Sequence, residues 1–203
     1  MNAAIKRQLK SGISFSLPGK LEAEVSEKLI EIIPSAEMVR FGKNGSDATS
    51  AAVRLARAYT GRDLVLVCGY HGWQDWYIGA TTRNKGVPKK VSDLTISFPY
   101  NDLVALKNLI SLHKGEIAAI IMEPMNTAFP QEGYLGEIRA ITKQQGIVLI
   151  FDETITGFRF DKSGAQGLFE VSPHLSTFGK GIANGYPLSV LGGKREIMPE
   201  VEN

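Results

Sequence analysis

Short continuous runs of apolar residues alternate along the chain with longer stretches in which apolar residues recur at helical spacing. The apolar runs predict strands at residues 38–41, 64–67, 94–98, 117–122, 147–151, 175–178 and 188–191. The amphipathic stretches predict helices at residues 21–33, 46–59, 101–113 and 133–145. Strands that alternate with helices in this way are typical of a mostly parallel sheet with helices on both faces. The expected fold class is therefore α/β, with three layers in the order α/β/α.

The first expected helix ends at Pro34 and carries its apolar residues on one face, namely Leu21, Val25, Leu29 and Ile32. The second helix can be capped by Ser46 or Asp47, whose side chains accept hydrogen bonds from N–H groups at a helix start. A long polar stretch between Gly69 and Ser92 separates two expected strands. A loop of this length in a compact domain is more often a binding loop or a lid than a simple connection.

The composition of the chain argues against nucleic-acid-binding, membrane-spanning and disulfide-rich proteins. The chain has 203 residues, enough for one packed domain, with 23 basic and 21 acidic residues mixed along it. No basic block indicates nucleic-acid binding, and no apolar run reaches membrane-spanning length. Cys68 is the single cysteine, so we expect no internal disulfide and no cysteine metal cluster. The polar first residues do not form a signal peptide, and we expect a cytoplasmic, enzyme-like domain.

Three charged residues lie within two positions of the end of an expected strand: Glu123, Asp152 and Lys180. Functional residues of parallel sheets collect at the carboxyl ends of the strands. A carboxylate at the end of the buried run 147–151 needs a cationic partner or hydrogen bonds to stay ionised. The alternatives for Asp152 are a helix cap or a structural ion pair. We expect no metal site, because the three histidines lie far apart in the sequence without ligand spacing: His71, His113 and His174.

Lys180 lies between two glycines, where the backbone permits close approach to a ligand. A surface lysine in a turn is the alternative. The segment is not a nucleotide-binding P-loop, since that motif requires serine or threonine after the lysine and Gly181 stands there.

Two further segments can contact a ligand. The run from Gly42 to Ala48 places a glycine-containing turn at a helix start, where free N–H groups and the helix dipole bind phosphate. An ordinary helix cap is the alternative. The aromatic run from Gly69 to Trp73 can stack on a flat ligand or pack the loop.

The combination of these segments is far more specific than any one of them. Their order and spacing resemble the class III aminotransferases that depend on pyridoxal 5′-phosphate (PLP), a fold type I family, and in particular its glutamate-1-semialdehyde aminomutase branch. The matching segments are 45–48, 70–72, 123–124, 151–153, 156–159 and 179–180. Lys180 follows Asp152 by 28 positions (180 − 152 = 28), as in that family.

The resemblance implies a role for each matching residue. Lys180 would form an imine with PLP and later move the substrate proton, and Asp152 would pair with the protonated pyridine nitrogen. Tyr70 would cover the ring, with His71 beside it, and Glu123 would help to position the cofactor. Gly45, Ser46 and Asp47 would form the phosphate cup. Arg159 and Gln166 also match the family motif, and a structural role is as good an interpretation for each.

The sequence also departs from the family. Aminomutases carry a polar residue that reaches the PLP hydroxyl shortly after the Glu-Pro pair, where this chain reads Met125-Asn126-Thr127-Ala128, and the loop after Gly72 looks shorter than theirs. Both differences favour an ordinary transaminase. Family members also extend beyond both ends of this chain. The resemblance thus implies a helical lead-in at 1–34 and an incomplete PLP-binding large domain at 35–203, without the small C-terminal domain.

Three hypotheses for the function follow. The first is a PLP-dependent aminotransferase that acts on a small amino donor and a carbonyl acceptor. The second is a 2,1-aminomutase of the semialdehyde type, and the third is a non-catalytic fragment of such an enzyme. The resemblance further implies a homodimer for the full-length protein. We expect no nucleic-acid or membrane partner.

Overall fold

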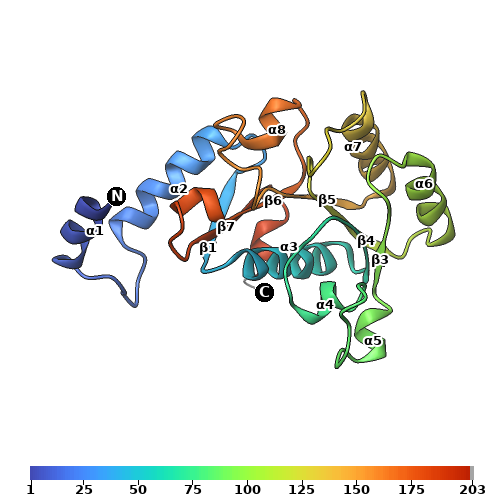
Figure 1. Cartoon of the computed structure of the whole chain (residues 1–203), viewed down its shortest axis with the longest axis horizontal. Coiled ribbons are helices and arrows are strands. Elements are labelled where there is room, and N and C mark those ends of the chain that lie inside the picture. Colours follow the sequence, from blue (N-terminus) through green and yellow to red (C-terminus); the bar gives the residue numbers. More distant parts are fainter. Residues whose placement is uncertain (202–203) are drawn as a thin grey trace.

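The computed structural model describes residues 1–201, and its centre is a seven-stranded sheet (Figure 1). In spatial order the strands are β1 (Met38–Gly42), β7 (Ser189–Gly193), β6 (Leu175–Phe178), β5 (Val148–Asp152), β4 (Ile117–Met122), β2 (Leu64–Cys68) and β3 (Thr95–Ser97). The five strands β6, β5, β4, β2 and β3 are parallel to one another, and β7 runs antiparallel to both β6 and β1. The prediction of a mostly parallel α/β sheet is confirmed.

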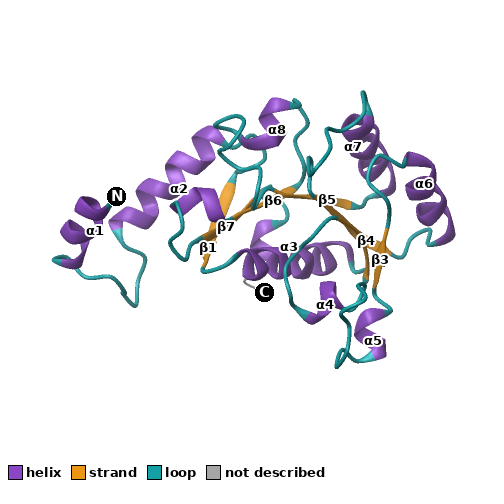
Figure 2. Cartoon of the chain, viewed as in Figure 1, coloured by secondary structure: helices purple, strands orange, loops and turns teal. Residues whose placement is uncertain are grey.

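Helices cover both faces of this sheet (Figure 2). On one face lie α2 (Lys20–Ile32), α8 (Gly164–Leu168), α7 (Tyr134–Gln145) and α6 (Leu103–Leu112). On the other lie α3 (Gly45–Thr60), α4 (Asp75–Ile78) and α5 (Lys89–Ser92). Successive strand residues pack on opposite faces: Ile121 contacts the cluster around α3, whereas Ile120 contacts the cluster around α6 and α7. This two-sided burial explains why the strands read as unbroken apolar runs.

Several short elements have no counterpart in the expected pattern. They are α1 (Asn2–Leu9), α4, α5, α8 and the 3₁₀ turns η1 (Lys180–Ala183) and η2 (Met198–Val201). The stretch from Gly69 to Ser92, expected as one long binding loop or lid, contains two short helices, α4 and α5. A helix of a single turn contains too few residues to show a 3.6-residue period, so hydrophobic periodicity does not detect it.

Helix α2, the first helix predicted from the sequence, buries only part of its expected apolar face. Leu29 is 4% exposed, whereas Leu21 and Val25 are 50% and 37% exposed. Figure 1 shows why: α1 and the start of α2 extend beyond the edge of the sheet at β1, and only the end of α2 packs on β-strands.

The start of α3 also differs from expectation. Asn44, and neither Ser46 nor Asp47, is the capping residue. Asn44 Oδ1 accepts a hydrogen bond from the Asp47 amide at 3.1 Å, and Asp47 Oδ2 accepts from the Asn44 amide at 3.2 Å. This reciprocal pair is a capping box. Because Asn44 caps the helix, the side chain of Ser46 is released from that role.

His174 joins the start of β6 to β5 and makes the fold sensitive to acid. Its Nδ1 accepts a hydrogen bond from the Leu149 amide at 2.8 Å, so this nitrogen must be unprotonated. Burial, aided by the charges of Arg139 and Lys194, lowers the pKa of His174 from 6.5 to about 4. The unfolded chain therefore binds a proton more readily than the folded chain, and stability is complete above pH 6.5 and declines as the pH falls toward 4.

We predict a loss of folding free energy on the order of 2 kcal/mol across this window. Urea unfolding at pH 7.5 and pH 5 measures it. His174→Gln keeps an acceptor for the Leu149 amide and should show a smaller difference between the two values. His113→Gln, which changes a histidine that faces Glu116 after α6, should behave like the parent chain. An unchanged difference in His174→Gln would contradict the assignment.

Candidate active site

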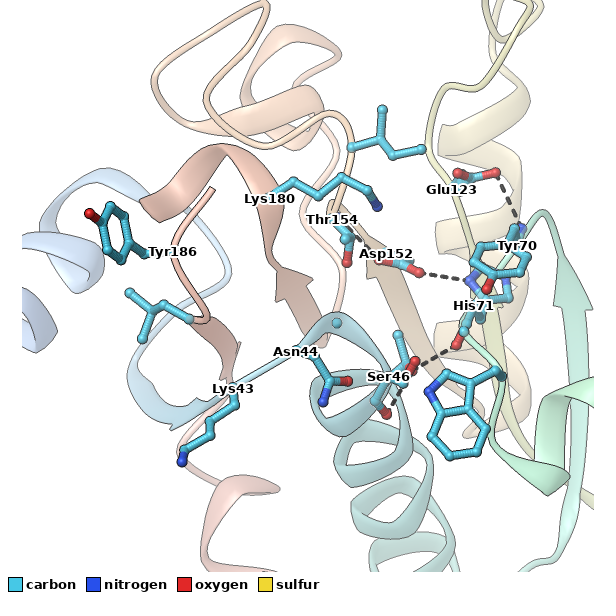
Figure 3. Close-up of a pocket in the computed structure, with 16 residues that line it drawn as sticks. Lys43, Asn44, Ser46, Tyr70, His71, Glu123, Asp152, Thr154, Lys180 and Tyr186 are labelled. Carbon is cyan, nitrogen blue, oxygen red and sulfur yellow. Dashed lines mark hydrogen bonds and ion pairs between the residues drawn. The ribbon is translucent and has the colours of Figure 1, made fainter. Parts of the chain in front are cut away.

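A cavity of about 350 Å³ opens where β4, β5 and β6 end and α3 begins (Figure 3). Its volume lies in the range of small-molecule sites. Seven of the eight expected site residues line it: Gly45, Ser46, Tyr70, His71, Glu123, Asp152 and Lys180. The fold thus brings together segments that are up to 135 positions apart (180 − 45 = 135).

Asp152 is held at the floor of this cavity as a carboxylate. It is 4% exposed, and its Oδ2 lies 2.9 Å from His71 Nδ1. Its Oδ1 accepts hydrogen bonds from the Thr154 amide at 3.1 Å and from Thr177 Oγ1 at 3.0 Å. Burial acts to raise the pKa of Asp152, but the hydrogen bond and charge of His71, together with Thr154, outweigh it and hold this pKa below its ordinary value. The site therefore presents a buried negative charge.

His71 supports that charge through both of its ring nitrogens. The ring is buried, and its Nε2 lies 3.1 Å from the Cys68 carbonyl oxygen. Since Asp152 and this carbonyl are both acceptors, the ring donates both bonds only when it carries two protons. In that state His71 and Asp152 form a buried ion pair. The sequence suggested only a position for His71 beside Tyr70, whereas the structure shows it bonded to Asp152.

Lys180 enters the cavity from the turn after β6, and Figure 3 shows its side chain directed toward the region between Thr154 and Glu123. Its φ of +41° lies in the left-handed region, which is sparsely populated by residues other than glycine and is frequent at functional sites. The preceding Gly179 has no side chain, and a Cβ there would lie 3.0 Å from Thr154 Cγ2 and 3.8 Å from Gly45 Cα. Glycine thus lets the lysine turn approach the start of α3.

Glu123 occupies the opposite wall, at the end of β4. Its Oε2 accepts a long hydrogen bond of 3.4 Å from the Tyr70 amide. Gly69 has a φ of +107°, and a Cβ at that position would overlap the Glu123 carboxylate. Burial raises the pKa of Glu123, and the charge of His71 and the Tyr70 amide offset this only in part.

The start of α3 forms the third part of the cavity. The first amides of a helix have no partner within it and lie at the positive end of its dipole, and here they belong to Gly45 and Ser46. Gly72, with a φ of +104°, packs so closely on Ser46 that a Cβ would overlap its hydroxyl. Thr49 Oγ1 lies 2.9 Å from the His71 carbonyl oxygen and joins the aromatic segment to α3. These amides and the Ser46 hydroxyl can bind an anion.

Asp47, the eighth expected site residue, does not line the cavity. Its Oδ2 accepts hydrogen bonds from the Lys43 and Asn44 amides and from Asn44 Nδ2. The carboxylate thereby stabilises the turn that precedes the helix.

Sequence reasoning missed several residues that shape the site. Thr49 and Thr154 line the cavity, and Thr177 contacts Asp152 from β6. Thr177 lies inside the expected strand 175–178, one residue before Phe178, and no pattern in the sequence marks it as a site residue. Of the two family-motif residues, Gln166 is buried behind Asp152 in a hydrogen-bond network, whereas Arg159 is exposed outside the cavity.

Other classes of site find no support in residues 1–201. Within that range no group of histidine, cysteine and acidic residues could hold a metal ion. No described helix is both long and apolar enough to span a bilayer. Cys68 is a free thiol whose pKa is raised to about 12, mainly by burial, so it is a poor nucleophile.

The family model for class-III aminotransferases matches residues 1–203. The chain therefore belongs to the class-III aminotransferase family. Among curated relatives, the glutamate-1-semialdehyde 2,1-aminomutase of Francisella philomiragia subsp. philomiragia is 42% identical over 214 residues, which cover 98% of this chain and 49% of that protein. The aminomutase of Citrifermentans bemidjiense is 43% identical over 211 residues, which cover 97% and 49%. The chain thus spans about half the length of these relatives.

Solved structures show the same relationship. An omega-transaminase from Sphaerobacter thermophilus superposes with a TM-score of 0.89 at 36% identity, over 97% of this chain and 50% of that one. The FumI protein of Sphingopyxis sp. MTA144, solved in its PLP internal aldimine form, gives 0.92 at 30% identity over 100% and 50%. A glutamate-1-semialdehyde aminomutase from Pseudomonas aeruginosa PAO1 gives 0.84 at 28% identity over 98% and 47%.

Proposed function

We propose that this chain is the cofactor-binding part of a PLP-dependent enzyme that transfers an amino group from an amino acid donor to a keto or aldehyde acceptor. The observation that carries the proposal is the convergence of Lys180, the ionised Asp152 and the free amides at the start of α3 on one cavity. We assign residues 35–203 to the cofactor-binding domain and residues 1–34 to a helical lead-in.

The chemistry of the cavity fits PLP. A phosphate requires N–H and O–H donors, which Gly45 and Ser46 supply at the helix start. A protonated pyridine nitrogen requires a buried anion, which Asp152 supplies. An aldehyde requires an amine within reach, which Lys180 supplies. The glycines at 45, 72 and 179 keep the cavity open at points where a Cβ would contact neighbouring atoms.

Each residue then has a defined task. When bound, PLP supplies a cationic ring that accepts the electron pair left on the substrate carbon. Asp152 holds the proton on the ring nitrogen, and His71 keeps Asp152 ionised and oriented. Lys180 would hold the cofactor through its amine, and the same amine, when free, would accept the proton from the substrate carbon as a general base and donate it back as a general acid. Tyr70 covers the ring, and Glu123 closes the wall beside it.

A 2,1-aminomutase is the second candidate, because the curated relatives described above carry that name. One observation favours the transaminase. Residues 125–128 do not line the cavity, Met125 is buried, and Asn126 Oδ1 accepts a hydrogen bond from the Ala128 amide within its own turn. The polar contact expected after the Glu-Pro pair of an aminomutase therefore has no equivalent in this stretch.

We further propose that the complete protein is a cytoplasmic homodimer. The mouth of the cavity carries exposed aromatic side chains, Tyr70, Trp73 and Tyr186, which are 59%, 68% and 50% exposed. Large exposed aromatic residues are enriched at protein interfaces.

The third candidate function is that of a fragment: the chain alone holds the cofactor without turning over substrate.

Addition of PLP to the purified chain tests the proposal. A visible absorbance band should appear, and borohydride treatment followed by peptide mass spectrometry should locate the cofactor on Lys180. Amino donors should then convert the cofactor to its amino form with release of a keto acid, whereas an aminomutase should isomerise its substrate without net release. Absence of any band at high chain and PLP concentrations would refute binding by this chain.

A further inference from the structure

Tyr77 does not line the cavity, but it contacts three consecutive residues beside it. Two of them, Tyr70 and His71, line the cavity, and the third, Gly69, precedes them. Its hydroxyl donates a hydrogen bond of 2.8 Å to the Gly69 carbonyl oxygen. Its ring packs edge-on against Tyr70, with ring centroids 5.6 Å apart, and against His71, with centroids 5.4 Å apart. The side chain is buried, at 7% exposure. One side chain thus contacts the whole segment 69–71.

Each residue of segment 69–71 makes a separate contact with the site. Gly69 packs on the Glu123 carboxylate, and the Tyr70 amide donates to that carboxylate. His71 bonds to Asp152. Figure 3 shows Tyr70 and His71 on the same wall, facing Glu123 and Asp152. A rotation of this segment would therefore disturb both carboxylates together.

Tyr77 is itself anchored to two other elements of the fold. It belongs to α4, whose neighbouring Trp76 donates from Nε1 to Ser50 Oγ of α3 at 2.9 Å. Thr95 Oγ1 of β3 donates to the Trp76 carbonyl oxygen at 2.6 Å. The ring of Trp76 also packs edge-on against that of Tyr77, at 5.8 Å. The single helical turn α4 is thereby fixed to α3 and β3.

We infer that Tyr77 is a positioning residue that fixes the orientation of His71, and through it the Asp152 carboxylate, in the proposed PLP site. The hydroxyl sets the Gly69 peptide, and the ring limits rotation of Tyr70 and His71. The helix α4, which lies within the stretch from Gly69 to Ser92, therefore acts as a rigid support for the site. This inference rests on the proposed function for its catalytic consequence and on the hydrogen bonds above for its structural content.

Hydrogen exchange of the His71 ring tests the inference without cofactor. Ring N–H protons of His71 should exchange slowly in the wild-type chain, because the ring is buried and each of its nitrogens faces a hydrogen-bond acceptor. Tyr77→Phe removes only the bond to Gly69 and should accelerate their exchange roughly fivefold to tenfold, the factor for one hydrogen bond. Tyr77→Leu also removes the ring packing and should abolish slow exchange. His71→Gln identifies the signals.

Tyr59→Phe is the matched control, since Tyr59 lies near the end of α3, is 43% exposed and does not line the cavity. It should leave His71 exchange unchanged. Amide exchange in the buried strand β4 reports global stability and should remain similar in Tyr77→Phe and Tyr59→Phe. Unchanged His71 exchange in Tyr77→Phe, acceleration equal to that of the β4 amides, or absence of slow ring protons in wild type would each overturn the inference.

A second measurement follows the cofactor. In chains that form the visible PLP band, the pH midpoint of that band should shift in Tyr77→Phe and stay constant in Tyr59→Phe, because Asp152 loses its fixed orientation only in the former. A constant midpoint in both would overturn the link to Asp152. A wild-type chain that forms no band overturns the proposed function alone, since the histidine exchange is measured without PLP.

Discussion

Replacement of Lys180 by alanine should abolish the visible PLP band and slow conversion of an amino donor by a factor of about 10⁴. The variant loses both the amine that attaches the cofactor and the base that moves the substrate proton. The phosphate donors at the start of α3 and the Asp152 carboxylate remain, so the variant should still bind PLP without covalent attachment. Absorbance spectroscopy, equilibrium dialysis with PLP and single-turnover kinetics measure the three quantities.

Lys107→Ala provides the control, because Lys107 pairs with Glu137 on the exposed surface at 3.2 Å. It should match the wild-type chain in all three measurements. A band that persists in Lys180→Ala, with borohydride labelling at another lysine, would show that the attachment site has been assigned wrongly.

Replacement of Glu153 by alanine should reduce the free energy of unfolding by about 3 to 5 kcal/mol. The carboxylate is fully buried behind Asp152 and accepts hydrogen bonds from Thr156 Oγ1 at 2.8 Å and from the Gln166 amide and Nε2 at 3.0 Å each. The Ala165 amide donates to it as well. Its removal leaves several buried donors without acceptors and opens a cavity between β5 and α8.

Urea unfolding at neutral pH measures this loss. Glu137→Ala is the matched control, with an exposed carboxylate in a surface ion pair, and should change stability by less than about 0.5 kcal/mol. A similar small effect in Glu153→Ala would mean that water replaces the lost acceptor. Since Glu153 directly follows Asp152, we also expect the variant to bind PLP more weakly.

The layered sheet was predictable because its strands are buried on both faces and therefore appear as apolar runs. All seven expected strands are present, and no strand end differs from expectation by more than two residues. The antiparallel direction of β7 was not predictable, since an apolar run such as 188–191 is the same whether its neighbours run with it or against it. The direction of β7 depends on the path of the connecting segment, which contains η1 and begins at Gly179.

The candidate site shows the same division. Lys180 and Asp152, which the structure places in one cavity, were predictable because each follows an expected strand and their spacing matches that of the family. The capping residue of α3 was misplaced, since Asn44, Ser46 and Asp47 are all able to cap and only the backbone geometry selects one. Thr177 was not predicted, because its contribution to the site is one hydrogen bond to Asp152, a residue 25 positions away in the sequence.

The sequence by itself determined the fold class and the family, and it indicated the two residues on which the proposed chemistry depends. Apolar runs and the spacing of motif residues can both be read directly from the order of residues in the chain. The tertiary structure alone decided how that chemistry is supported: the ion pair between His71 and Asp152, the network around Glu153 and the contacts of Tyr77. These are contacts between side chains on different elements, and their partners are defined only when the sheet and its helices have packed.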